Sequence, residues 1–224
     1  MQWLRKKFVF DMDGVLIDSE GLHFETTKRV CACQGYLLSR AEYDRHVGRP
    51  SAAMWSEWIS HFGWQRSVNS LIVKELEEQN CLLEQEGWKV PLVPGVREFL
   101  SFCKSSNITM AVASSASASF IKKMLCEHEI SGYFDAVVST ESVKHGKPHP
   151  DVFVYVAGCL RATVSECVVI EDSSNGVQAA KNAGMITVGF INPNSGQQDF
   201  SSADVIVDDY KTLQAMMREL EPCE

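Results

Sequence analysis

The sequence predicts an α/β fold in which a doubly wound parallel sheet carries an inserted helical region. After residue 94, short apolar segments alternate with helical patterns, which predicts parallel strands joined by right-handed crossovers. Between residues 19 and 91 the apolar residues recur at helical spacing and the strand signals fade. Polar segments follow the predicted strands, at the carboxyl ends where sheets of this kind bind ligands.

The predicted strands are short and apolar. We expect them at residues 8–10, 109–114, 136–139, 168–171, 186–190 and 205–207. Because the helical stretch follows the first strand, residues 1–18 and 92–224 should form a Rossmann-like core and residues 19–91 a helical cap domain. The hinges between them are expected near residues 14–20 and 88–94.

Two carboxylates follow the first predicted strand, and a glycine comes directly after them. Side chains two residues apart at a strand end project to the same side, so Asp11 and Asp13 should face one small volume. Their repulsion would be relieved by a divalent cation or a shared proton, and Gly14 lets the chain turn away sharply. The spacing indicates a metal site, an acid/base pair or both, although Asp and Gly are also common in surface turns.

Two further segments carry groups suited to phosphate. Ser114 and the backbone N–H groups beside it could donate hydrogen bonds to a phosphate oxygen, although serines also simply terminate strands. Lys147 stands in a Gly-Lys-Pro segment whose loop is stiffened by two prolines. A lysine held in this way can neutralise an aspartate or a phosphate, whereas a lone surface lysine is usually solvated.

The fourth segment is a predicted strand that ends in Glu171 and Asp172 and runs into a helical pattern. Mg2+ prefers a few carboxylates together with waters and phosphate oxygens, and Asp11, Asp13 and Asp172 could supply the carboxylates jointly. Asp172 or Ser173 could also be the N-cap of the following helix. That role does not exclude metal binding, because a helix N-terminus also favours anions.

The four segments, in this order and at this spacing, resemble the haloacid dehalogenase superfamily of phosphotransferases. The resemblance runs over residues 7–208 and is weakest over residues 37–90. The chain is similar to the subgroup that contains beta-phosphoglucomutase and small sugar-phosphate phosphatases, through segments 18–23, 132–135 and 146–151. Haloacid dehalogenases proper lack the second aspartate, so Asp13 favours phosphate chemistry over carbon–halogen chemistry.

The resemblance implies a catalytic core that transfers a phosphoryl group through an aspartyl-phosphate. Asp11 would attack phosphorus as the nucleophile, and Asp13 would protonate the leaving oxygen and later deprotonate the incoming water or sugar hydroxyl. The Asp11 carboxylate, the Asp13 backbone carbonyl and Asp172 would hold Mg2+, which would offset charge on the phosphoryl oxygens. Ser114 and Lys147 would complete the phosphate cradle.

The resemblance also implies supporting residues. Glu171 is expected to orient Lys147 or a metal-bound water, or to join the metal ligands. Ser115, His23 and Arg49 are expected to bind the substrate. His23 lies just past the first hinge, and its position suits a surface histidine equally well.

The cap decides whether water or a sugar hydroxyl receives the phosphoryl group, and here the chain departs from the mutase pattern. Beta-phosphoglucomutase has an arginine three residues after a cap glycine, whereas the position three residues after Gly48 is Ser51. The asparagine that the mutase has four residues after its phosphate-binding serine is Ala118 here. Both departures favour a Mg2+-dependent phosphatase of a small phosphomonoester, a sugar phosphate by resemblance. Arg49 could still reach the arginine position from a shifted loop, so a phosphomutase is the alternative.

Composition bounds the other classes of function. A net charge of −8 argues against nucleic-acid binding, which relies on clustered Lys and Arg. Eight cysteines without a Cys-x-x-Cys pair are expected to be free thiols in a reducing compartment. Neither a signal-peptide pattern nor a run of about 18 apolar residues is present, so we expect a cytoplasmic protein that binds no membrane. The resemblance implies a small phosphorylated metabolite as the binding partner, and we expect a monomer because nothing in the sequence demands a protein partner. The presence of Asp11, Asp13, Lys147 and Asp172 argues against a noncatalytic binding protein of this fold.

Overall fold

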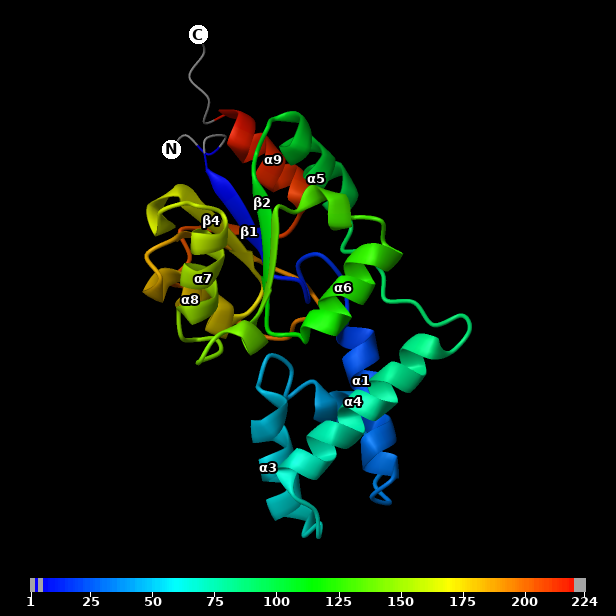
Figure 1. Ribbon diagram of the computed structural model, residues 1–224. Coiled ribbons are helices and arrows are strands. Elements are labelled where there is room, and N and C mark those ends of the chain that lie inside the picture. Colours follow the sequence, from blue (N-terminus) through cyan, green and yellow to red (C-terminus); the bar gives the residue numbers. More distant parts are fainter. Residues whose placement is uncertain (1–2, 4–5, 220–224) are drawn as a thin grey trace. The chain divides into compact units, whose positions relative to one another are not determined.

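The computed structural model describes residue 3 and residues 6–219, which form two compact units (Figure 1). The first unit comprises the described residues up to Asp18 together with those from Leu92 onward, and it contains the whole sheet. The second unit, Ser19–Pro91, is helical. The assignment of these units as a catalytic core and a cap domain stays a prediction.

Six parallel strands form one sheet in the order β3-β2-β1-β4-β5-β6, which confirms the predicted doubly wound α/β fold. Strand β1 lies inside the sheet, and the chain adds strands on one side of it and then on the other. Each strand lies within one residue of its expected range: β1 Lys7–Phe10, β2 Met110–Ser114, β3 Ala136–Ser139, β4 Cys167–Glu171, β5 Ile186–Phe190 and β6 Val205–Val207.

The side chains of β1 alternate between two apolar cores. Phe8 and Phe10 point to one face, where both rings pack against Phe99 at centroid distances of 6.3 and 6.1 Å. Val9, the residue between them, belongs to the apolar cluster on the other face. All three strand residues are fully buried, because a parallel sheet is covered by helices on both faces.

Two pairs of helices cover the sheet. Helices α5 (Val96–Ser105) and α9 (Tyr210–Glu219) contact each other on the face to which Phe8 points. Helices α7 (Asp151–Cys159) and α8 (Ser174–Asn182) contact each other on the opposite face. This unit also contains α6 Ala118–Glu127 and the 3-10 helices η2 Ser131–Tyr133, η3 Thr140–Ser142 and η4 Val164–Glu166.

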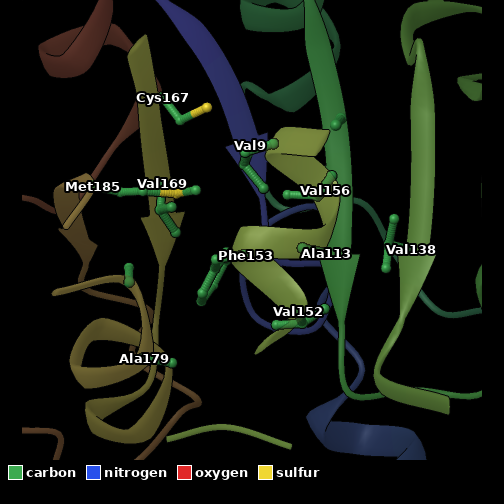
Figure 2. Packing of buried hydrophobic residues seen from close by; sticks show 13 residues of the cluster. Val9, Ala113, Val138, Val152, Phe153, Val156, Cys167, Val169, Ala179 and Met185 are labelled. Atoms are coloured by element: carbon green, nitrogen blue, oxygen red, sulfur yellow. The ribbon is translucent and has the colours of Figure 1, made fainter. Parts of the chain in front are cut away.

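Figure 2 shows the apolar cluster that α7 and α8 form with the sheet. Phe153 and Val156 of α7 are fully buried in this cluster. The strands contribute Val9 and Val169, which are also fully buried. Burial of apolar surface is the main force that holds the two helices against the sheet. Because α7 directly follows the loop that carries Lys147, the same packing fixes where that loop ends.

The helical unit has an apolar core of its own. It is built from α1 Glu20–Ala32, α2 Arg40–Tyr43, α3 Ser51–Phe62 and α4 Val68–Glu84. Helix α4 contacts α1 and α3, and buried side chains from all four helices form the core. Trp55 is fully buried there, and its indole N–H donates to Glu75 Oε2 at 3.1 Å, which satisfies the polar atom of this large side chain.

The cysteines in the described part of the chain are free thiols, as the sequence predicts. Cys223 lies outside the described residues. Of the helices that the structure describes, none combines the length and the apolar character needed to span a membrane.

Val156→Ala should lower the free energy of unfolding by about 2 kcal/mol, because it removes buried methyl groups and leaves a cavity beside the sheet. Val154→Ala is the matched control on the same helix, since the Val154 side chain is 49% exposed. This control should change stability by less than about 0.5 kcal/mol. Urea unfolding followed by circular dichroism measures both variants, and equal losses would contradict the assignment of Val156 to the core.

Candidate active site

Three neighbouring strands, β1, β2 and β4, end at the same edge of the sheet. Asp11 directly follows β1, and its backbone N–H donates to the Ile170 carbonyl at 3.0 Å, so it remains bonded to β4. Ser114 is the last residue of β2. Glu171 is the last residue of β4, and Asp172 follows it. The parallel arrangement therefore places these residues, which are far apart in sequence, at one edge.

Lys147 connects two of these strand ends. Its ammonium group donates to Asp11 Oδ1 and to Glu171 Oε1, the second bond being 2.5 Å long. It also donates to the backbone carbonyl of Ala113 at 3.1 Å. The three bonds use all three hydrogens of the ammonium group, and the side chain is only 6% exposed. The lysine is thus held in the interior between two carboxylates.

The loop that presents Lys147 is tied to both covering helices. Asn182 of α8 donates its side-chain amide to the Pro148 carbonyl at 3.1 Å. At the start of α7, Asp151 Oδ2 accepts the backbone N–H of His145 at 3.2 Å. Because both ends of the loop are anchored in this way, Lys147 projects from a fixed segment of backbone.

Glu171 uses both of its carboxylate oxygens inside the protein. One oxygen accepts from Lys147, and the other accepts from the backbone N–H and the hydroxyl of Ser173, at 3.1 and 2.9 Å. Helix α8 begins directly against this side chain, since a Cβ added at Gly176 would overlap the Glu171 carboxyl group. Glu171 therefore lies where it orients Lys147, and its role as a metal ligand stays a prediction.

Burial and repulsion act on the carboxylates at this edge. Burial raises the pKa of Asp11 to about 8, against the opposing effect of Lys147. The charges of Glu171 and Asp13 add to this rise. Burial also raises the pKa of Asp172 well above its usual range, and the neighbouring charge of Glu171 strengthens the effect. Each of these acids is therefore harder to ionise than it would be in water.

The balance of charge fits a divalent cation. Burial alone would lower the pKa of Lys147, but its carboxylate partners Asp11 and Glu171 raise it, so the ammonium group stays charged. A cation near Asp11 and Asp172 would offset the repulsion that remains. Among the described residues, no three side chains of His, Cys, Asp or Glu are arranged to hold a metal ion. A Mg2+ site of two carboxylates and a backbone carbonyl does not need three, because Mg2+ keeps several waters.

The turn after β1 depends on a glycine. Asp13 is half-buried in this turn, and the N–H of Gly14 donates to the Ile17 carbonyl at 2.8 Å. Gly14 has a φ of +73°, which L side chains rarely adopt. A Cβ at this position would also overlap the carboxylate of Asp172. Glycine is therefore required here by both the backbone conformation and the space available.

Ser195 is a residue of this site that no sequence pattern indicates. Its hydroxyl donates to Asp172 Oδ2, across a separation of 23 residues in the chain. The surrounding Asn-Pro-Asn-Ser-Gly segment indicates only a turn, so its composition carries no sign of this contact.

The residues expected to contact substrate lie in both units. Ser114 is fully buried at the sheet edge, where its hydroxyl accepts from the Ala116 N–H at 3.0 Å, and Ser115 beside it is exposed. His23 lies on α1 and Arg49 precedes α3, so both belong to the helical unit. The roles of His23 and Arg49 in substrate binding stay predictions.

Comparison with known proteins shows the family to which the chain belongs. A model of the haloacid dehalogenase-like hydrolase family matches residues 8–190. The chain belongs to this family. The hydrolase is 33% identical over 177 residues to a phosphorylated carbohydrates phosphatase of Thermotoga maritima. The aligned region covers 79% of this chain and 81% of that protein. It is 28% identical over 207 residues to beta-phosphoglucomutase of Bacillus subtilis, with 90% of this chain and 88% of that protein covered.

A solved structure shows the same fold. The crystal structure described as a predicted phosphoglycolate phosphatase of Haemophilus somnus matches the hydrolase with a TM-score of 0.81 at 20% identity. The match covers 95% of this chain and 98% of that chain. The resemblance stated from the four sequence segments is therefore confirmed, and the family and its phosphatase relative identify the protein as an enzyme.

Gly176→Ala should destabilise the hydrolase by about 1–3 kcal/mol, because the added methyl group meets the buried Glu171 carboxyl group. Gly158→Ala is the matched control in α7, where an added Cβ meets nothing within 4 Å. This control should stabilise the protein by about 0.5 kcal/mol, as alanine is the better helix former. Thermal unfolding compares the two variants, and a neutral Gly176→Ala would show that Glu171 is not held tightly.

Proposed function

We propose that this hydrolase is a Mg2+-dependent phosphatase that hydrolyses a small phosphomonoester, with a sugar phosphate as its substrate. The observation that carries the proposal is the buried contact between Asp11 and Lys147 at the carboxyl end of β1. A nucleophile that faces an anionic phosphate must be held in place and partly neutralised, and Lys147 does both. The similarity to a phosphorylated carbohydrates phosphatase supports the substrate class.

The chemistry proceeds in two displacements at phosphorus. A carboxylate oxygen of Asp11 forms a bond to phosphorus while the bond from phosphorus to the leaving oxygen breaks, and the Asp13 carboxyl group gives its proton to that oxygen. A water oxygen then attacks phosphorus as Asp13 takes a proton from the water. The bond between Asp11 and phosphorus breaks, which releases inorganic phosphate and restores both aspartates.

Other residues of the sheet edge hold the phosphate and balance its charge. Lys147 keeps Asp11 oriented and offsets negative charge as the phosphate approaches. Ser114, at the end of β2, would donate its hydroxyl hydrogen to a phosphate oxygen. The Asp11 carboxylate, the Asp13 backbone carbonyl and Asp172 would hold Mg2+, which when bound supplies positive charge beside the phosphoryl oxygens.

Asp11 must lose its proton before it can attack. Burial raises the pKa of Asp11 above its ordinary value, so its proton is harder to remove in the absence of a cation. A positive charge nearby lowers the pKa of a carboxyl group, so a bound cation and the ionised nucleophile stabilise each other. The same burial that raises the pKa of Asp11 thus makes the nucleophile dependent on a cation.

The contacts of Arg49 inside the helical unit favour water over a phosphorylated sugar as the acceptor of the phosphoryl group. The Arg49 guanidinium lies 2.9 Å from Glu57 Oε2 and 3.1 Å from His46 Nδ1. Both contacts compete with a second substrate phosphate for this arginine. Ser51, at the position where the mutase pattern has an arginine, begins α3. Phosphomutase activity is the second candidate, because a beta-phosphoglucomutase covers 90% of this chain.

We also propose that the enzyme acts in the cytoplasm, as a monomer whose substrate is a small phosphorylated metabolite. The free thiols among its described cysteines support a reducing compartment.

Release of inorganic phosphate from a panel of sugar phosphates and other phosphomonoesters, with Mg2+ present, tests the function. Asp11→Asn should lower the rate by about 10³-fold or more, because an amide is not a nucleophile. Asp208→Asn, which changes an exposed carboxylate of the same unit, is the control and should keep the wild-type rate.

A coupled assay for glucose 6-phosphate formed from beta-glucose 1-phosphate separates the two candidate activities. Isomerisation without phosphate release would replace the phosphatase with the mutase. Near-normal phosphate release by Asp11→Asn would exclude Asp11 as the nucleophile, provided that circular dichroism shows the variant to be folded.

A further inference from the structure

A segment outside the four sequence motifs reaches the carboxyl edge of the sheet. Residues 192–198 follow β5 on the way to β6, and we call them the β5–β6 loop. Within this loop, the Ser195 hydroxyl donates a hydrogen bond to Asp172 Oδ2. Asp172 is 8% exposed, so burial has removed most of the water that would otherwise solvate its carboxylate. Ser195 supplies a donor from the protein in place of that water.

Side-chain hydrogen bonds hold the β5–β6 loop on both sides of Ser195. The buried Asn192 donates its amide to the Gly14 carbonyl at 2.9 Å, in the turn after β1. Gln198 accepts the Ser174 N–H at 2.9 Å, at the start of α8, and donates to the Ser195 carbonyl at 2.7 Å. The loop is therefore tied to two segments of the site, and these ties fix the backbone from which the Ser195 hydroxyl projects.

The turn after β1 leaves the space in which this contact forms. A Cβ at Gly14 would overlap the Asp172 carboxylate and lie 2.8 Å from Ser195 Oγ. The bare backbone of Gly14 thus allows the hydroxyl and the carboxylate to meet beside it. Three separate segments of the chain, the turn after β1, the end of β4 and the β5–β6 loop, combine to build the contact.

We propose that Ser195 is a positioning residue that orients the Asp172 carboxylate for a divalent cation. The inference rests on the proposed function, in which Asp172 helps to hold Mg2+. Groups that hydrogen-bond a ligating carboxylate set its orientation, and their loss typically costs about 10–100-fold in metal affinity. The bond to Oδ2 holds one oxygen of Asp172 and thereby sets the direction of the other.

Ser195 acts through Asp172 and not on phosphorus. Its removal should therefore change the Mg2+ requirement of the enzyme more than the maximal rate. A residue that only stabilised the fold would do the reverse, since its loss would lower the melting temperature and leave the Mg2+ requirement as it was.

The test follows the melting temperature of Ser195→Ala across a MgCl2 titration without substrate, and the Mg2+ dependence of its phosphate release. The midpoints of both curves should rise about tenfold, while the maximal rate and the melting temperature in chelator stay close to wild type. Ser195→Thr keeps the hydroxyl and should restore the midpoints. Ser202→Ala removes an exposed hydroxyl from the same connection and should match the wild type.

Midpoints for Ser195→Ala that equal those of the wild type would overturn the inference and leave the phosphatase in place. A lower melting temperature in chelator with unchanged midpoints would also overturn it. If Ser195→Ala does not fold, Gln198→Ala, which removes the side-chain hydrogen bonds between the loop and Ser174, must raise the midpoints, and unchanged midpoints would refute the inference. A wild type that is neither stabilised by Mg2+ nor releases phosphate would overturn the proposed function and this inference together.

Discussion

Buried negative charge at the carboxyl edge of the sheet is the constraint on which the site depends. Asp11, Glu171 and Asp172 follow or end two neighbouring strands, and taking carboxylates out of water is costly unless each finds a donor or a counter-charge. Lys147 donates hydrogen bonds to Asp11 and Glu171, and Ser195 donates one to Asp172. One ammonium group and a hydroxyl do not cancel three acids, so the site favours a cation. Burial, strengthened by the charges of Glu171 and Asp13, raises the pKa of Asp11, the proposed nucleophile, and so links its ionisation to cation binding.

The fold meets this constraint through packing and backbone shape. Because β1 lies between β2 and β4, Asp11, Glu171 and Asp172 share one edge with the end of β2. Apolar packing of α7 against the sheet fixes the loop that carries Lys147. The start of α8 contacts Glu171 at Gly176, where a larger residue would overlap the carboxyl group. A second glycine, Gly14, opens the turn in which Asp172 and Ser195 meet. A rigid apolar core therefore holds charged groups at distances that they would not adopt in water.

Sequence patterns predict the strands and the acids at their ends for a physical reason. A strand buried on both faces must be a continuous apolar run, and the residues that follow it must fall at the sheet edge. Asp11 and Asp172 are predictable in this way. Ser195 cannot be predicted in this way, because its contact joins segments that are distant in the chain and the residues beside it are typical of an ordinary turn. The ion pair of Arg49 with Glu57 is equally unpredictable from the sequence, since it depends on the conformation of the loop that precedes α3.

Uncompensated charge in the metal-free site should appear as a loss of stability at higher pH, which thermal unfolding measures directly. Folding raises the pKa of Asp11 from an ordinary 3.8 to about 8, so the contribution of this group to stability should fall as pH rises between these values. Asp11→Asn cannot ionise. In chelator we expect this variant to melt above the wild type, by a margin that grows between about pH 5 and about pH 8 and shrinks when Mg2+ is added. A variant that melts below the wild type throughout, or a margin that does not change with pH, would contradict the buried-charge explanation.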